Sequence, residues 1–257
     1  MRDTIYTIPV TEAFSIDCEC PLCQLHKKLD DECVDYILGP SLMEPDSRQV
    51  TNEKGFCRRH FELLYNSQKN RLGLGLILDS FLNEKNLNHK KVYEQHASGI
   101  EKESCQSVLK NLSNKITSKQ TETTKYIDDM LSSLKSMEKS CSICSKLDYT
   151  MDRYIDVTIY LWGKEQDFRN QFNKKGFCLK HFEMLLTGSK KYLSGSDCAS
   201  FVKNLAELMI SNMERINEDV SWFTKKFDYR YNDAPWKNSQ DAVPRSIQKI
   251  VGYSDLK

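Results

Sequence analysis

Eight cysteine and histidine residues form two copies of one spaced pattern. A CxxC followed by a CxxH occurs in each half of the 257-residue chain, and the two copies are 121 positions apart. Three thiolates and one imidazole make up the ligand set of a closed tetrahedral zinc site. The sequence therefore predicts two zinc ions, each held within one half. The predicted ligands are Cys20, Cys23, Cys57 and His60 for the first ion, and Cys141, Cys144, Cys178 and His181 for the second.

The predicted sites are structural rather than catalytic, because all four positions around each ion are filled. Catalytic zinc usually keeps three protein ligands and one open position. An iron–sulfur cluster usually needs four cysteines. A CxxC that loses its metal can form a disulfide, so a redox switch remains an alternative.

The repeat excludes nearby groups of the right chemical type. The positions that correspond to Cys18 and His26 in the second half are Lys139 and Leu147, so neither Cys18 nor His26 is a predicted ligand. Other cysteines without a Cys or His counterpart are interpreted as small apolar residues. They are Cys33, Cys105 and Cys198.

The repeat continues upstream of each CxxH as the pattern D-x-R-x-x-x-N-x-K-G-F-C-x-x-H-F-E. It contains Asp46 and Arg48 in the first half and Asp167 and Arg169 in the second. We expect each Asp and Arg to bond with each other or with the loop backbone, and so to fix the approach to the metal. The alternative is that the two arginines form a symmetric anion site.

The residues between the motifs predict an all-α fold, since apolar residues recur at helical spacing and no stretch alternates as a strand does. We expect an internally duplicated, two-lobed helical protein with one Cys3His zinc site in each lobe. The expected helices are residues 21–38, a helix that begins at GFCRRHF, and residues 71–84, 143–162 and 197–227. Residues 1–19 are expected to be extended, because Pro9 opposes a helix, and residues 41–54 to be a polar loop.

A long polar segment from Val92 to Glu138 separates the halves and predicts one or two linking helices. The residues of this segment that recur at steps of three, four or seven positions are Val108, Leu112, Ile116, Thr123, Ile127, Met130, Leu134 and Met137. The chain is accordingly divided into a first zinc-clasped repeat (1–91), the linker (92–138), a second zinc-clasped repeat (139–230) and a C-terminal arm (231–257).

The C-terminal arm has no counterpart in the first half. Alternation of Phe227, Tyr229 and Tyr231 with charged residues predicts an extended segment, and Asp241 is placed to cap a short helix that ends at Gly252. We expect the arm to wrap over the helical body. The residues expected to be buried there are Trp236, Ile247 and Ile250. In the alternative, the arm closes one side of a ligand or peptide groove lined by Tyr229, Arg230, Trp236 and Arg245.

Charge and composition narrow the classes of function. Lys plus Arg number 37 and Asp plus Glu number 36, a balance that disfavours nucleic acid and anionic membranes as partners. No stretch reads as a signal peptide or a membrane-spanning helix. Ten cysteines without an export signal favour metal binding in a reducing cytoplasm over a disulfide framework.

The chain resembles an uncharacterised bacterial family that is filed as a domain of unknown function. The resemblance rests on CPLC, GPSLMEPDSRQVTNEKGFCRRHF, NRLGLGLILDSFL and the tail FDYRYNDAPWKNSQDAVPRSIQKIVG, and it covers nearly the whole chain. Some members carry the label of an ABC-transporter substrate-binding protein. The family has no assigned activity, so the resemblance implies none here.

These observations favour a zinc-stabilised binding or scaffold protein that recognises a protein partner or a small ligand in a groove between the lobes. The first alternative is a redox sensor or an enzyme that uses exposed thiols or the two arginines. Two of the five histidines are committed to metal and no Ser/His/Asp set is present, so little acid–base equipment remains for catalysis. A nucleic-acid-binding regulator is a further alternative.

Overall fold

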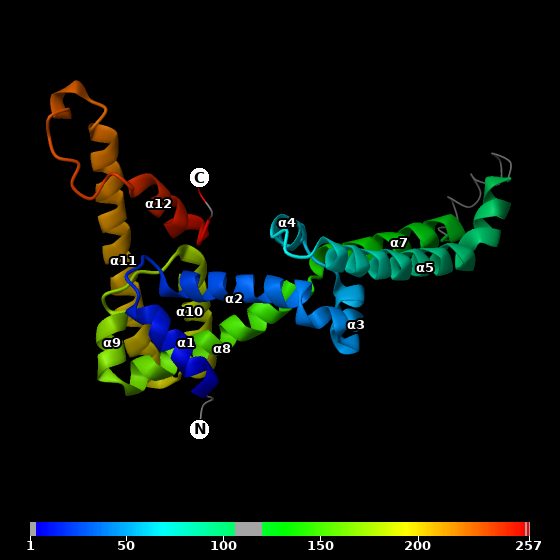
Figure 1. Cartoon of the computed structure of the whole chain (residues 1–257), viewed down its shortest axis with the longest axis horizontal. Coiled ribbons are helices and arrows are strands. Elements are labelled where there is room, and N and C mark those ends of the chain that lie inside the picture. The colour runs from blue at the N-terminus through cyan, green and yellow to red at the C-terminus, as the bar shows by residue number, and fades with distance from the viewer. Residues whose placement is uncertain (1–3, 106–119, 255, 257) are drawn as a thin grey trace. The chain divides into compact units, whose positions relative to one another are not determined.

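The computed structural model describes residues 4–105, 120–254 and 256. The described residues are 81% helical and form 11 helices and no strand, which confirms the all-α prediction. The helices are α1 (Thr4–Ser15), α2 (Pro21–Leu38), α3 (Pro45–Lys54), α4 (Arg58–Asn66), α5 (Arg71–Ser104), α7 (Glu122–Lys139), α8 (Ser142–Lys164), α9 (Gln166–Phe172), α10 (Leu179–Tyr192), α11 (Gly195–Lys225) and α12 (Ala242–Val251) (Figure 1). Two 3-10 turns, η1 (Pro40–Met43) and η2 (Tyr229–Tyr231), complete the secondary structure.

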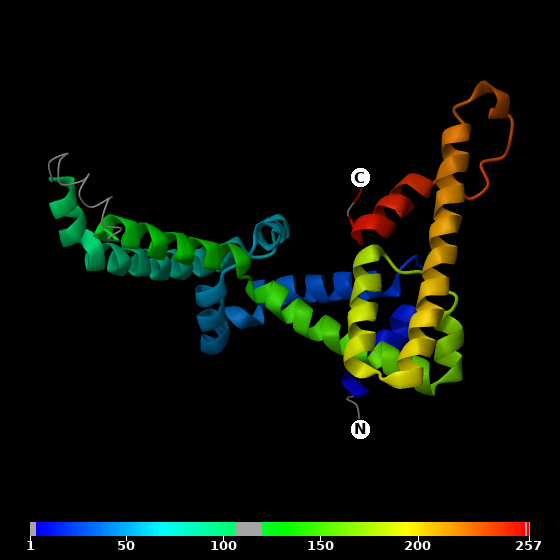
Figure 2. The same ribbon diagram turned by 180° about the vertical axis from the view of Figure 1, so that it is seen from behind.

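Two compact units make up the fold. The first combines Met1–Asp31 with Leu147–Lys257, and the second is the continuous segment Glu32–Lys146. Their boundaries fall within α2 and α8, so each of these two helices contributes to both units. Within the first unit, α10, α11 and α12 contact one another (Figure 2). The division of the sequence at residues 91, 138 and 230 stays a prediction.

The N-terminal segment is helical, and the prediction of an extended lead-in is wrong. α1 contains Pro9, whose ring removes the hydrogen bond to the carbonyl of Ile5. Val10, Ala13 and Phe14 follow at helical spacing and are almost completely buried. Burying Val10 and Phe14 contributes about 1.5–3 kcal/mol each, which offsets the roughly 3 kcal/mol that a proline costs inside a helix.

The polar loop predicted for residues 41–54 is also wrong, because most of it forms η1 and α3. Pro45 is the first residue of α3 and Asp46 lies in its first turn, which are both favourable positions at a helix start. The matching segment of the second half forms α9, whose Phe168 and Phe172 are buried. Their rings lie 4.8 and 5.8 Å from that of Phe14. Packing on α1 therefore stabilises α9, a helix too short to stand out in the sequence.

The bounds of several helices agree closely with those predicted from the sequence. α2 has the predicted bounds, and α4 begins directly after Cys57. α8 continues through Gly163 to Lys164, two residues past its predicted end. α11 covers Gly195–Lys225 against a prediction of 197–227.

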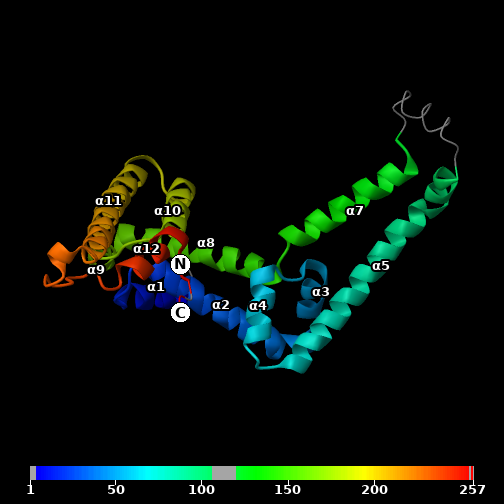
Figure 3. The ribbon, with the colours of Figure 1, turned by 90° about the horizontal axis from the view of Figure 1, so that it is seen from above.

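The described part of the linker between the halves lies mostly in two long helices. α5 begins at Arg71 as predicted, but it continues to Ser104 rather than ending near residue 84. α7 forms the second helix, whereas Val108, Leu112 and Ile116 lie outside the described residues. α5 and α7 contact each other, and Figure 3 shows them converging toward the C-terminal end of α5.

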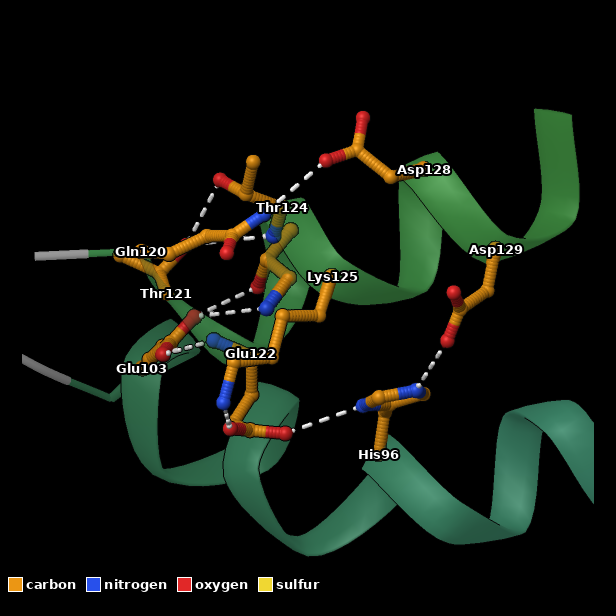
Figure 4. Close-up of polar contacts among 10 residues, drawn as sticks. His96, Glu103, Gln120, Thr121, Glu122, Thr124, Lys125, Asp128 and Asp129 are labelled. Carbon is orange, nitrogen blue, oxygen red and sulfur yellow. Dashed lines mark hydrogen bonds and ion pairs between the residues drawn. The ribbon is translucent and has the colours of Figure 1, made fainter. Parts of the chain in front are cut away.

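Charged groups join α5 and α7 where they converge (Figure 4). Glu103 accepts hydrogen bonds from the backbone N–H groups of Glu122 and Thr123 at 2.8 and 3.1 Å, which satisfies two donors in the first turn of α7. His96 lies between two carboxylates, with Nδ1 2.9 Å from Glu122 and Nε2 3.1 Å from Asp129. Because both ring nitrogens face acceptors, the site suits a doubly protonated, charged imidazole.

The contact between α5 and α7 is expected to weaken as the pH rises. Hydrogen bonds to Glu122 and Asp129 raise the pKa of His96. A raised pKa gives stability that is fully present below the unfolded value of about 6.5 and is lost as the pH rises through the folded value. Urea unfolding from about pH 6 to about pH 9 should show this loss in the wild type but not in His96→Gln. Identical pH profiles for the two proteins would contradict the prediction.

Candidate metal centres

The first group of ligand atoms lies in the first unit, at the starts of α2 and α10. Cys20 precedes α2 and Cys23 lies in its first turn, whereas Cys178 is the N-cap of α10 and His181 is in its first turn. The Nδ1 atom of His181 is 3.5, 3.3 and 3.1 Å from the sulfur atoms of Cys20, Cys23 and Cys178. All four residues are buried.

The second group lies in the second unit and has the same construction at the starts of α4 and α8. Cys57 is the N-cap of α4, His60 lies in its first turn, and Cys141 and Cys144 are at the start of α8. The Nδ1 atom of His60 is 3.2 Å from the sulfur atoms of Cys57 and Cys141 and 3.4 Å from that of Cys144. The sulfur atoms of Cys57 and Cys144 are 3.8 Å apart.

The spacing of these atoms fits one tetrahedral metal ion in each group. Metal–sulfur bonds of about 2.3 Å and metal–nitrogen bonds of about 2.0–2.1 Å place the corners of a tetrahedron roughly 3.5–3.8 Å apart. The nitrogen–sulfur separations are between 3.1 and 3.5 Å, the Cys23–Cys178 and Cys57–Cys144 sulfur separations are 3.6 and 3.8 Å, and all ligand atoms of a group lie within 4.8 Å of one another. Each group can therefore hold one ion through three thiolates and one imidazole.

The pairing of the motifs differs from the prediction. Each group combines the CxxC of one half with the CxxH of the other half, so neither ion is held within one half. Helix length supplies the reason. The 15 residues of α2 that follow Cys23 carry the chain about 22 Å away from it, and the 10 residues of α3 span only about 15 Å before Cys57 is reached. The CxxC of the first half is completed instead by Cys178 and His181.

The thiols in each group alter one another's protonation. In the first group, the hydrogen bond with Cys178, together with burial, raises the pKa of Cys23 to about 12. In the second group, burial opposes ionisation of Cys141, but hydrogen bonds from His60 and the backbone of Cys144 lower its pKa to about 6. Several acids that share one site lose their protons unequally when too little positive charge is present. A divalent cation would supply that charge and stabilise all three thiolates.

The two groups differ in exposure, which predicts an order of metal loss. The first group is buried throughout, whereas Cys57 and Cys144 of the second are partly exposed. We expect excess chelator to remove metal from the second centre first, because its ligands are easier to reach. Alkylation followed by peptide mass spectrometry should therefore label Cys57 and Cys144 before Cys20 and Cys178. Release in one phase with simultaneous labelling would refute this order.

The cysteines and the histidine that the repeat excludes as metal ligands differ in their surroundings. Cys18 borders a cavity beside the first centre, and the His26 ring lies 5.9 Å from that of His181. Cys33 is buried and Cys105 is exposed. Cys198 is partly buried and donates to the carbonyl of Ser189. None of them belongs to either group of possible ligands among the described residues.

The two arginines of the repeated pattern bond to helices. Arg48 donates to Ser80 Oγ at 3.0 Å and to the carbonyl of Leu76 at 3.3 Å, both in α5. Arg169 donates to the carbonyl of Trp162 at 2.9 Å, and its guanidinium lies 4.6 Å from the centre of the Trp162 ring. Asp46 and Asp167 occupy the first turns of α3 and α9. The arginines belong to different units, and each ties a short helix to a longer one.

The segment after α11 is a turn rather than the predicted extended segment. η2 covers Tyr229–Tyr231, and the Asp228 side chain accepts a hydrogen bond from the backbone of Arg230. Lys226 is buried and donates to three loop carbonyls, those of Tyr231, Asn232 and Ala234. This lysine holds the turn against the end of α11, because its hydrogen bonds draw the three carbonyls together.

The four residues proposed to line a groove have different surroundings and different partners. Tyr229 is 83% exposed. Arg230 pairs with Asp228. The Trp236 ring is half-buried and lies 6.0 Å from the ring of Phe223. Arg245 pairs with Asp219, Asp241 and Glu19.

The short helix of the arm is present, but its expected buried face is exposed. α12 follows Asp241 and ends at Gly252, as predicted. Ile247 and Ile250 are 37% and 57% exposed, so the prediction that they are buried is wrong. The polar side of α12, including Arg245, packs on the body because Asp219 and Glu19 offer partners for the guanidinium. Lys249, a buried residue of α12, was not predicted as a functional residue, because its spacing resembles that of any surface lysine.

The fold and the paired clusters define a class of helical protein with two four-residue Cys/His groups that could each hold a metal ion. The chain belongs to a family of unknown function, DUF6062, whose model matches residues 1–257. No curated protein and no solved structure matches it. Among the described residues, no helix combines the length and the apolar character needed to cross a membrane.

Proposed function

We propose that the chain is a cytoplasmic binding protein in which two structural zinc ions hold the helices and one face of α12 docks an apolar helix of a partner protein. Zinc suits the donors, because three thiolates and one imidazole fill all four positions around it. Filled positions favour a structural role for the metal over a catalytic one. A reducing compartment keeps the thiols available to the metal.

The observation that carries the proposal is the orientation of α12. Its inward side contains Ala242 and Lys249, which are 0% and 4% exposed. Its outward side consists of four aliphatic residues at i, i+4, i+7 and i+8, each between 37% and 59% exposed. They are Val243, Ile247, Ile250 and Val251. An amphipathic helix ordinarily buries its apolar face, so an exposed one is a candidate interaction surface.

The charge and size of this face indicate which kind of partner it can bind. The cations Arg245 and Lys249 are turned toward the body, so the face offers no positive charge to phosphate groups. About two turns of helix cover far less than the roughly 800 Å² per partner of a typical stable interface, which disfavours a second copy. Anchors at i, i+4 and i+7 match the way that one amphipathic helix is recognised through its apolar side.

A photo-reactive residue at position 250 tests this docking in cells, and the same residue at position 229 is the control. Tyr229 is well exposed but lies outside α12. We expect one protein to be cross-linked through an aliphatic helix from position 250 only. With the purified pair, Ile247→Asp should weaken binding by about tenfold or more and leave the melting temperature and metal content unchanged. Cross-links to a second copy or to lipid, or none, would overturn the proposal.

A further inference from the structure

The end of α12 covers the first metal centre. Gly252 has a φ of +84°, and a Cβ atom added there would lie 3.6 Å from the sulfur of Cys178 and 3.9 Å from that of Cys23. The next residue, Tyr253, borders the same cavity as Cys23 and Cys178. The segment that ends α12 therefore touches two of the four ligands.

Lys249 brings a buried charge to the same place. It is 4% exposed, and its Nζ has no hydrogen-bond partner among the described residues. It lines a cavity of about 170 Å³ that Cys20, Cys23 and Cys178 also border. Gly176 leaves room for this side chain, since a Cβ atom there would lie 2.9 Å from Nζ. A buried ammonium without a counter-charge is unfavourable. Because Lys249 belongs to α12, this helix is stable in its observed position only if a nearby negative charge balances that of the lysine.

The metal centre supplies that negative charge. Zinc with three thiolates and a neutral histidine carries one net negative charge. Glu19, the nearby acid, is already paired with Arg215 and Arg245. Burial, together with the charge of Arg215, lowers the pKa of Lys249, and the negative charges of Glu19, Cys20 and Cys178 oppose this shift in part. The single charge of Lys249 and that of the loaded centre thus offset each other.

We propose that Lys249, Gly252 and Tyr253 form an outer layer of the first metal centre, so that the bound metal seats α12. The coupling is reciprocal: a seated α12 strengthens metal binding, and metal loss loosens α12. The part of this inference that concerns binding rests on the proposed function, because α12 carries the docking face. Metal at the first centre then controls whether the face is presented to a partner.

Zinc affinity tests the outer layer directly. Lys249→Met keeps a long side chain but removes the charge, and competition with a chromophoric chelator measures the affinity of each centre. We expect the first centre to bind zinc about 10- to 100-fold more weakly, with the second centre unchanged. The matched control is Lys226→Met, since Lys226 is also buried in the first unit but bonds to loop carbonyls. A first-centre affinity within about twofold of wild type would overturn the proposal.

Amide hydrogen exchange tests whether the metal seats α12. Stripping metal from the wild type should speed exchange across 242–253 by about tenfold or more, because this segment loses its local protection. The double variant Cys57→Ser, Cys144→Ser is the control, since it removes ligands of the second centre only. Its α12 should exchange like that of the wild type. Unchanged exchange in α12 after loss of the first metal would refute the coupling.

These two readouts need no partner, so they separate this inference from the proposed function. If zinc affinity and exchange behave as expected while position 250 cross-links nothing, the coupling stands and the docking proposal fails. If Ile247→Asp abolishes partner binding while Lys249→Met leaves zinc affinity unchanged, the docking proposal stands and the coupling fails.

Discussion

Removing both motifs of one structural centre should leave one zinc per chain, whereas removing both motifs of one sequence half should leave none. The first variant combines Cys20→Ser, Cys23→Ser, Cys178→Ser and His181→Ala. The second combines Cys20→Ser, Cys23→Ser, Cys57→Ser and His60→Ala. In the first variant the second centre keeps all four ligands, but in the second variant each centre keeps only two. Structural zinc contributes an apparent binding free energy of about 10–16 kcal/mol, so the difference should be large.

Elemental analysis of untagged protein measures this difference. The control combines Cys18→Ser and His26→Ala, which lie near the first centre but outside its ligand group. It should keep both ions. One ion retained in the second variant and none in the first would restore the pairing within halves and refute the pairing across them.

Truncating Phe14 to alanine should destabilise the first unit by about 3–5 kcal/mol. Its side chain is 1% exposed and contacts a cluster formed by Phe168, Phe172 and Phe177. Removal of the ring leaves a cavity that these rigid neighbours cannot fill. Phe177 directly precedes Cys178, so the loss also loosens the approach to the first metal centre.

Urea unfolding followed by circular dichroism measures the cost, and α1 provides its own control. Ile8 lies on the same helix but is 57% exposed, so Ile8→Ala should change stability by less than about 0.5 kcal/mol. Equal effects of Phe14→Ala and Ile8→Ala would show that α1 is not packed as described.

The sequence was sufficient to find the ligand types and most long helices. Cysteine and histidine chemistry is local, so a CxxC and a CxxH can be recognised without a fold. α2 was predicted to the residue because its apolar spacing, its Pro21 start and the Gly39-Pro40 stop agree. By contrast, α1 and α9 owe their stability to burial of Phe14, Phe168 and Phe172 against one another, which no local pattern reveals.

The repeat was misleading where it concerned partners in space. Equal spacing in both halves suggested local closure, although the length of α2 already separated Cys23 from Cys57. Residues at equivalent positions of the repeat can also have different neighbours, as the two glycines of the GFC motifs show. A Cβ atom at Gly55 would lie 2.7 Å from the ring of Phe81, whereas at Gly176 it would meet Lys249. Lys249 itself has no counterpart in the first half, so duplication could not indicate it.

The pairing across halves also places one closed loop inside another, which has a consequence for how the chain assembles. Cys23 and Cys178 are 155 positions apart, and His60 and Cys141, between them, are 81 apart. During synthesis from the N-terminus, the inner ligands are all available before Cys178 is made. Once the inner centre has closed, only the 34 positions on either side of it separate Cys23 from Cys178, and the entropic cost of the outer closure falls by about 0.7 kcal/mol. Cys20 and Cys23, the first ligands to emerge, are thus the last to be completed.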